Sequence, residues 1–295
     1  MAPAIHVGPE PPLEYLVEAV KQGGGEITSL ADAEAVVWAG SPEELPALPN
    51  GIKWVQLQSA GIEPWVERIR DTPEVRWTSA VGAYAMQVAE LALALLLAGT
   101  RGIHRYARAT TWAPEDERVL EGSKVAIIGA GGIGKELIRL LEPHDVEIVA
   151  VTRSGRDGTL PVDRLPEVWG DADHFVLCAP STDDTTHLVG AEQLAQMQPH
   201  SWIVNIARGS LIDDDALVAA LNDDAIGGAA LDVTDPEPLP DGHPLWTCPN
   251  ALITPHVANP PNTMARDLAK RVRENVRRYV GGEELLAPVS PEQGY

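Results

Sequence analysis

Three polar residues able to take part in acid–base chemistry follow apolar runs in the second half of the chain. Arg208 and His256 each come directly after such a run, and Glu237 stands between two prolines shortly after a third. In a parallel sheet the carboxyl ends of strands lie along one edge and line the ligand crevice. We therefore expect the three side chains to converge there. Taken singly, each has a more ordinary explanation as a surface ion-pair partner, a turn residue or a loop cap.

A glycine-rich segment, residues 129–134 (Gly-Ala-Gly-Gly-Ile-Gly), lies between the apolar run 124–128 and a segment of helical character. Strand, tight turn and helix N terminus form the setting in which G-x-G-x-x-G holds a pyrophosphate. Gly129 permits the turn, Gly131 lets the backbone approach the phosphates, and Gly134 lets the helix pack closely on the strand. The segment predicts dinucleotide binding, and a purely structural glycine turn is the alternative.

The residues after the next apolar run, 147–151, indicate which dinucleotide binds. NAD enzymes usually have an acidic residue there, which accepts hydrogen bonds from the ribose hydroxyls. This chain has Arg153 and Ser154 instead, which suit the 2′-phosphate of NADP(H). We expect NADP(H) to be preferred, with NAD(H) possible. In the alternative, Arg153 is a solvated loop residue and Asp157 serves the ribose.

Apolar runs alternate with helical segments along most of the chain, and this alternation predicts an α/β protein with parallel sheets. The expected strands are 4–7, 35–38, 54–57, 124–128, 147–151, 202–207, 228–233 and 251–255. A length of 295 residues suits two domains. We expect residues 1–100 and 261–295 to form a substrate-binding domain and residues 101–260 a dinucleotide-binding domain.

The most apolar stretch, residues 87–98, is interrupted by Glu90. It is too short and too polar to span a membrane. Two interpretations remain open for it: a helix buried in the core, or a helix packed against a second subunit.

The charge balance limits the class of partner. The chain has 22 Lys and Arg against 43 Asp and Glu, a net charge of -21, which disfavours nucleic acid and anionic membrane surfaces as partners. Adaptation to high salt and a biased genome composition explain this acidity equally well. Two cysteines and no zinc-type spacing predict no disulfide framework and no metal site. We expect a cytoplasmic protein, because no signal-peptide pattern is visible at the start.

Taken together, these segments resemble the D-isomer-specific 2-hydroxyacid dehydrogenases, and the likeness extends over nearly the whole chain. Besides the glycine loop, the motifs that carry it are Asn205-Ile-Ala-Arg208-Gly209, Ala230-Leu-Asp232-Val, Asp235-Pro-Glu237-Pro and Thr254-Pro-His256. The segments around residues 82–90, 152–154 and 256–258 look most like the glyoxylate/hydroxypyruvate reductase branch. The resemblance implies two Rossmann-like doubly wound parallel-sheet domains, one flavodoxin-like and substrate-binding, the other dinucleotide-binding, with a cleft between them.

The resemblance also implies a role for each polar residue. Arg208 would hold the substrate carboxylate and polarise its C2 carbonyl. His256 would give a proton to the carbonyl oxygen as hydride arrives from the nicotinamide. Glu237 would bind the other imidazole nitrogen and fix the tautomer, and Asp232 would bind the nicotinamide carboxamide. The remaining histidines, among them His174 and His200, have no acidic partner in a matching motif.

Further binding residues are implied in both domains. The backbone N–H groups of Ala60 and Gly61 would bind the substrate carboxylate. Tyr84 would contribute to the substrate site near the nicotinamide, at a position where the family often has a small polar residue. The additional cofactor contacts would be Gly132, Ile133, Ala179, Pro180, Thr185, Ile206, Ala207, Arg208, His256 and Ala258.

We therefore expect a homodimeric NAD(P)H-dependent reductase that converts a small 2-oxoacid, such as glyoxylate or hydroxypyruvate, into a D-2-hydroxyacid. One alternative is the oxidation of another small acid, formate or phosphite, on the same scaffold. Formate enzymes usually pair the histidine with glutamine, so Glu237 disfavours formate. An alternative of a different class is a binding module that senses the cofactor without turnover.

Overall fold

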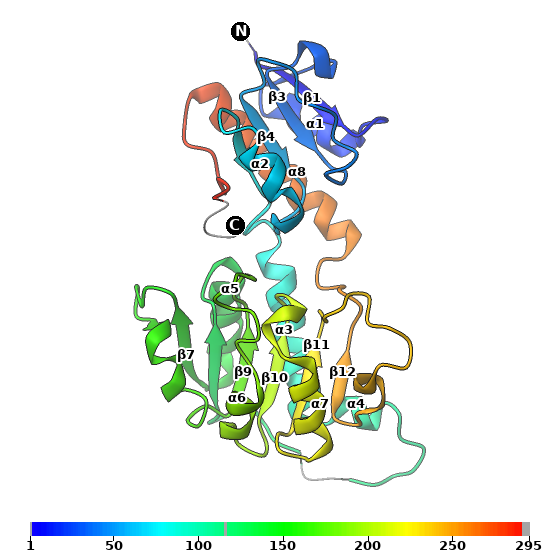
Figure 1. Ribbon diagram of the computed structural model, residues 1–295, viewed down its shortest axis with the longest axis vertical. Helices are drawn as coiled ribbons and strands as arrows, with labels where there is room; N and C mark the ends of the chain where they lie inside the picture. The colour runs from blue at the N-terminus through cyan, green and yellow to red at the C-terminus, as the bar shows by residue number, and fades with distance from the viewer. Residues whose placement is uncertain (1, 115–116, 291–295) are drawn as a thin grey trace. The chain divides into compact units, whose positions relative to one another are not determined.

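The computed structural model describes residues 2–114 and 117–290. Within it the chain forms two compact units, each built on a parallel sheet (Figure 1). The first unit comprises Met1–Tyr84 and Pro260–Tyr295, and the second comprises Ala85–Asn259. The prediction of an α/β protein with two parallel-sheet domains is confirmed.

The first unit has a five-stranded sheet in the order β2-β1-β3-β4-β5, with every pair parallel. Its strands are β1 (Ala4–Gly8), β2 (Glu26–Ile27), β3 (Ala35–Trp38), β4 (Trp54–Leu57) and β5 (Arg76–Thr78). Its α-helices are α1 (Glu14–Gln22), α2 (Val66–Arg70) and α8 (Pro261–Gly281). This strand order is the flavodoxin-like one. Both β3 and β4 are buried at every position, as expected for parallel strands covered on both faces.

Helix α8 joins the last part of the chain to the first unit. It packs along α1, and Gly23 permits the close approach, because a Cβ there would lie 2.6 Å from the Cβ of Val276. The fully buried Asn275 donates to the Gln56 side chain of β4 at 2.7 Å and accepts from the Leu286 N–H at 2.7 Å. The five-stranded sheet therefore depends on residues from both ends of the chain.

The second unit has a seven-stranded parallel sheet in the order β12-β11-β10-β9-β6-β7-β8. Its strands are β6 (Lys124–Ile128), β7 (Glu147–Thr152), β8 (Leu160–Pro161), β9 (His174–Leu177), β10 (Trp202–Asn205), β11 (Gly228–Leu231) and β12 (Ala251–Ile253). Its α-helices are α3 (Ala85–Thr100), α4 (Ile103–Tyr106), α5 (Gly132–Leu141), α6 (Ala191–Gln196) and α7 (Asp214–Asn222). The strand order reverses between β6 and β9, which is the topological switch point where α/β sheets bind ligands.

Helix α3 belongs to the second unit. The first boundary between the units therefore lies before this helix. We had expected it after the helix, near residue 100. The helix packs against α5, β10 and β11, with Leu95, Leu96 and Gly99 on its buried face. The segment that follows residue 100 is polar and resembles a linker in sequence. For this reason the expected boundary fell after the helix and not before it. No helix among the described residues is long and apolar enough to span a membrane.

Candidate active site

The residues predicted to carry chemistry in the second unit gather beyond the carboxyl ends of its strands. Gly129 follows β6, Arg153 follows β7, Ala179 follows β9, Arg208 follows β10, Asp232 follows β11, and His256 follows β12. Because these strands are adjacent and parallel, the loops that follow them share one edge of the sheet. The structure thus places on one edge groups that lie far apart in the sequence.

The glycine loop has the backbone geometry that phosphate binding needs. Gly129 has φ 101°, and a Cβ there would lie 2.6 Å from the Ala179 nitrogen. A Cβ on Gly134 would overlap the Gly129 carbonyl oxygen, so only glycine lets α5 begin this close to the turn. A Cβ on Gly131 would meet no heavy atom within 4 Å. The loop is therefore tightly packed on its inner side and open at Gly131, where a pyrophosphate would approach.

The loop after β7 presents Arg153 and Ser154 to solvent. Thr152 closes the base of this loop, since its hydroxyl contacts that of Thr159 at 2.6 Å and accepts from the Gly155 N–H at 3.1 Å. Across the described residues the Arg153 guanidinium has no hydrogen-bond or ion-pair partner. Asp157, the alternative partner of the ribose, is also exposed.

Glu237 and His256 meet directly. The imidazole Nδ1 lies 2.6 Å from the Glu237 carboxylate Oε1, and the two side chains remain 52% and 43% exposed. A carboxylate at Nδ1 fixes a proton on that nitrogen. The Nε2 atom, on the other side of the ring, is left for a ligand.

The backbone of His256 is held in an unusual conformation by Asp232. His256 has φ 50°, a region that residues other than glycine seldom adopt. The Asp232 carboxylate, 1% exposed, accepts hydrogen bonds from the Thr254 hydroxyl at 2.5 Å, the Val257 N–H at 2.9 Å and the Ala258 N–H at 3.0 Å. Asp232 therefore fixes the turn that carries the histidine. Its contact with the nicotinamide carboxamide stays a prediction.

Arg208 stands in a turn shaped by Asn205. The Asn205 amide donates to the Arg208 carbonyl at 2.8 Å, and its side-chain oxygen accepts from the Ala207 N–H at 3.1 Å. The Arg208 guanidinium donates to the Ala207 carbonyl at 2.7 Å. A Cβ on Gly209 would overlap the Thr234 carbonyl group. The arginine turn therefore lies against the segment that leads to Glu237.

The other predicted cofactor residues lie in neighbouring loops of the same edge. The Thr185 hydroxyl donates to the Pro180 carbonyl at 2.7 Å. The Ser181 and Ser210 hydroxyls are 2.9 Å apart and join the loops after β9 and β10. The buried positions in this set are Ala179, Ile206, Ala207 and Ala258.

The predicted carboxylate-binding loop of the first unit follows β4. Ala60 and Gly61 are half-buried there. The Tyr84 hydroxyl donates to the Gln58 carbonyl at 2.8 Å, and its ring is 7% exposed. Burial raises the pKa of this phenol well above its usual value. Tyr84 therefore braces the backbone of this loop, and a direct contact with substrate stays a prediction.

Three positioning residues were not anticipated from the sequence: Asn205, Thr254 and Gln58. Asn205 has a recognisable signal, because an asparagine at the end of a strand often binds the backbone two residues further on. Thr254 and Gln58 act on residues that adjoin them only in the folded sheets. Among the described residues, no group of three or more His, Cys, Asp and Glu side chains has an arrangement that could hold a metal ion.

Comparison with known proteins agrees with this geometry. Residues 92–258 match the NAD-binding domain of the D-isomer specific 2-hydroxyacid dehydrogenases. The chain belongs to this family. It is accordingly an NAD(P)-dependent oxidoreductase, and the glycine loop fits the dinucleotide that the family binds.

Three family relatives illustrate the similarity. An uncharacterized protein of Corynebacterium melassecola is 42% identical over 94% of this chain and 95% of its own length. A D-isomer specific 2-hydroxyacid dehydrogenase from Xanthobacter autotrophicus, solved with NADPH and MES, has a TM-score of 0.87 at 27% identity, with both chains fully covered. The NADPH-dependent glyoxylate/hydroxypyruvate reductase of Sinorhizobium meliloti, solved with NADP and malonate, has a TM-score of 0.78 at 25% identity, covering 99% of this chain and 98% of that one.

Two glycine substitutions should separate folding from cofactor binding in this dehydrogenase. Gly131→Ala should change the free energy of unfolding by less than about 0.5 kcal/mol, because the added methyl meets open space. It should weaken NADPH binding about tenfold, since the methyl would obstruct the phosphates. Gly134→Ala should instead destabilise the fold by about 1–3 kcal/mol through overpacking. Denaturant titration and fluorescence binding measure both, and unchanged affinity in Gly131→Ala would place the phosphates elsewhere.

Proposed function

We propose that this protein reduces a small 2-oxoacid of the glyoxylate or hydroxypyruvate type to the D-2-hydroxyacid, with a proton donated by His256. The observation that carries this proposal is the hydrogen bond between His256 and Glu237, set on the edge that also carries the glycine loop. The nicotinamide, when bound, supplies the hydride. The reductase from Sinorhizobium meliloti supports the choice of substrate class.

His256 acts as the general acid through Nε2. Glu237 accepts the hydrogen bond from Nδ1, keeps the ring oriented and stabilises its protonated form. In the reverse direction the neutral Nε2 takes the proton from the substrate hydroxyl. The exposure of the pair lets the histidine recover its proton from solvent between turnovers.

Arg208 binds the substrate carboxylate and polarises the C2 carbonyl. A guanidinium offers a fork of N–H donors that matches a carboxylate, which a lysine cannot reproduce. The N–H groups of Ala60 and Gly61 supply a second set of donors for the same carboxylate.

NADP(H) is the preferred cofactor. The proposal is supported by the exposed Arg153, which follows β7 and whose guanidinium would pair with a 2′-phosphate, and by the hydroxyl of the next residue, Ser154. The relatives solved with NADPH and NADP support this assignment.

The chain works as a homodimer. Two large apolar side chains are exposed on the segment after α3: Ile103 is 53% exposed and Trp112 100%. Exposed apolar side chains of this size are typical of a surface covered by another subunit.

Removal of the general acid should abolish most of the turnover. His256→Ala should lower kcat about 10²–10⁴-fold, the usual range for a lost general acid, with NADPH affinity nearly unchanged. The measurement is the loss of nicotinamide absorbance with a panel of 2-oxoacids, and His144→Ala, from the same unit, is the control. Wild-type turnover in His256→Ala would remove His256 from the mechanism. Cofactor binding without turnover on any acid would reject the reductase proposal.

The cofactor preference should depend on one side chain. Arg153→Ala should weaken NADPH binding about tenfold, because a charge-assisted hydrogen bond to phosphate is lost, and should leave NADH binding unchanged. Arg164→Ala, another exposed arginine of the same unit, is the matched control. Equal loss for both cofactors, or tighter NADH binding by the wild type, would contradict the assignment.

The dimer should be visible by sedimentation. The wild type should sediment at twice the chain mass of 31.6 kDa. Trp112→Glu should shift the population toward the single chain, since it places a charge within the apolar surface. Val162→Glu, which alters an exposed apolar residue elsewhere in the unit, should remain dimeric. A wild-type species at 31.6 kDa would contradict the dimer.

A further inference from the structure

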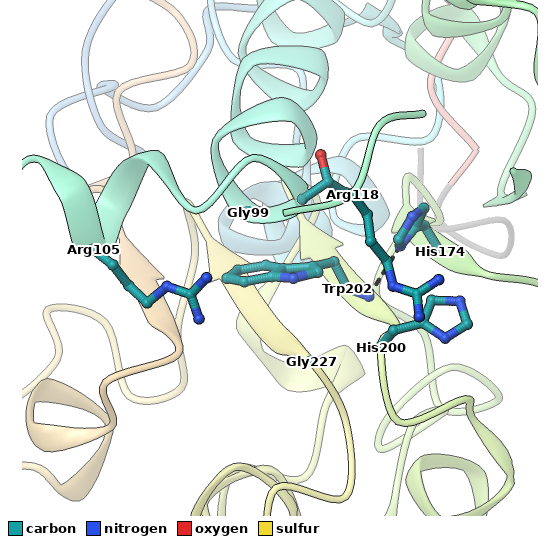
Figure 2. Close-up of a pocket in the computed structure, with 8 residues that line it drawn as sticks. Gly99, Arg105, Arg118, His174, His200, Trp202 and Gly227 are labelled. Carbon is teal, nitrogen blue, oxygen red and sulfur yellow. Dashed lines mark hydrogen bonds between the residues drawn. The ribbon is translucent and has the colours of Figure 1, made fainter. Parts of the chain in front are cut away.

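A second group of basic side chains lies at the opposite end of the seven-stranded sheet from the candidate active site. His174 begins β9 and Trp202 begins β10, so both mark the amino ends of their strands. Together with Arg105, Arg118 and His200 they line a cavity of about 140 Å³ (Figure 2). Among the described residues, no carboxylate lines this cavity. The adjoining surface hollow, which shares Arg118 and both histidines, is also lined by Glu117, Glu121 and Asp173.

The Trp202 ring forms an apolar wall of the cavity. The ring is 6% exposed and contacts His104 edge to face at 5.0 Å between centroids. The ring packs closely against two glycines, since a Cβ on Gly99 or Gly228 would overlap it. The wall is therefore rigid, and an anion beside it is partly shielded from water.

His174 offers a buried N–H group to the cavity. Its side chain is 1% exposed, and its Nδ1 lies 3.2 Å from the backbone nitrogen of Trp202. Because Nδ1 accepts this hydrogen bond, the ring proton resides on Nε2. Burial lowers the pKa of His174 to about 4, and the nearby Arg118 and His200 add to this shift while Asp173 opposes it. At neutral pH the ring is thus a neutral donor, and in the described parts of the chain its Nε2 has no protein partner.

His200 lines the same cavity as His174 and contacts the carboxylate of Asp173. The His200 Nε2 lies 2.8 Å from the Asp173 carboxylate, although no acidic partner was expected for it from the sequence. The same carboxylate accepts from the Lys124 N–H at 2.7 Å. Asp173 therefore accepts hydrogen bonds from two donors, and among the described residues the His200 Nδ1 atom has no hydrogen-bond partner.

Arg118 completes the set. Figure 2 shows its guanidinium beside the rings of His174 and His200. The side chain is exposed, and over residues 2–114 and 117–290 no hydrogen bond or ion pair engages it. The protein has 43 acidic residues against 22 basic ones. An arginine that none of the described carboxylates engages, beside two histidines, can bind an anion from outside the chain.

We propose that this cavity binds a phosphate group, either inorganic phosphate or the phosphate of a monoester. The Arg118 guanidinium binds two of its oxygens, and the His174 Nε2–H donates to a third, while His200 lies alongside. Donors that come from separate strand ends and from a loop suit a tetrahedral oxyanion, whose oxygens diverge, better than a planar carboxylate. The site is distinct from the glycine loop, because the two lie at opposite ends of the same strands.

The test is a titration of the ¹⁵N-labelled full-length protein followed through the imidazole nitrogens. Inorganic phosphate, glycerol phosphate, acetate and chloride are compared at constant ionic strength, with saturating NADPH present so that the glycine loop is occupied. We expect phosphate or glycerol phosphate to shift the His174 Nε2 signal with a saturable curve. Tighter binding of glycerol phosphate assigns the site to monoesters, and tighter binding of inorganic phosphate assigns it to the free ion.

Two variants make the assignment specific. Arg118→Ala should weaken phosphate binding at least about tenfold, the equivalent of one charge-assisted hydrogen bond. Arg164→Ala, an exposed arginine of the same unit outside both the cavity and the proposed dimer surface, should bind as the wild type does. Both positions are exposed, so neither change should impair folding. Equal shifts with chloride, preferential binding of acetate, or undiminished binding by Arg118→Ala would overturn the proposal.

Discussion

The arrangement of the candidate active site depends on one buried carboxylate. Asp232 accepts hydrogen bonds from a hydroxyl and from two backbone N–H groups of the turn that follows β12. Leaving a buried carboxylate without donors costs several kcal/mol, so this turn has one strongly preferred conformation. His256 consequently keeps a left-handed backbone that directs its ring at Glu237. The buried Asp232 thus determines the geometry of the exposed pair of Glu237 and His256.

Local and distant contacts differ in how well the sequence predicts them. The glycine loop was predictable because each glycine acts on backbone within a few residues or on the neighbouring strand. The pairing of Glu237 with His256 was expected only through the resemblance to a family. The hydrogen bonds by which Asp232 holds the turn of His256, and the Asp173–His200 pair, were not foreseen. Both depend on which strands lie side by side, and neither spacing nor periodicity encodes that order.

The net charge of the whole chain is negative, whereas single arginines at the two ends of the seven-stranded sheet are positive. Over the whole chain the excess of carboxylates disfavours polyanions. At the two ends of the seven-stranded sheet, however, the exposed arginines Arg153 and Arg118 have no partners among the described residues, and neutral donors accompany them. A short-range site of this kind is screened less than the surface field. Local geometry can therefore favour a small anion at these two places, although the overall charge disfavours a polyanion.

The return of the chain through α8 has a consequence for synthesis on the ribosome. The second unit is one continuous segment, Ala85–Asn259, whereas the first unit needs residues from both sides of it. Gln56 in β4 obtains its Asn275 partner only when α8 has been made. The nascent chain can thus complete the seven-stranded sheet while the five-stranded one still lacks its covering helix. In the order of synthesis, the residues of the second unit are therefore complete before those of the first, whereas domains usually become complete from the N terminus.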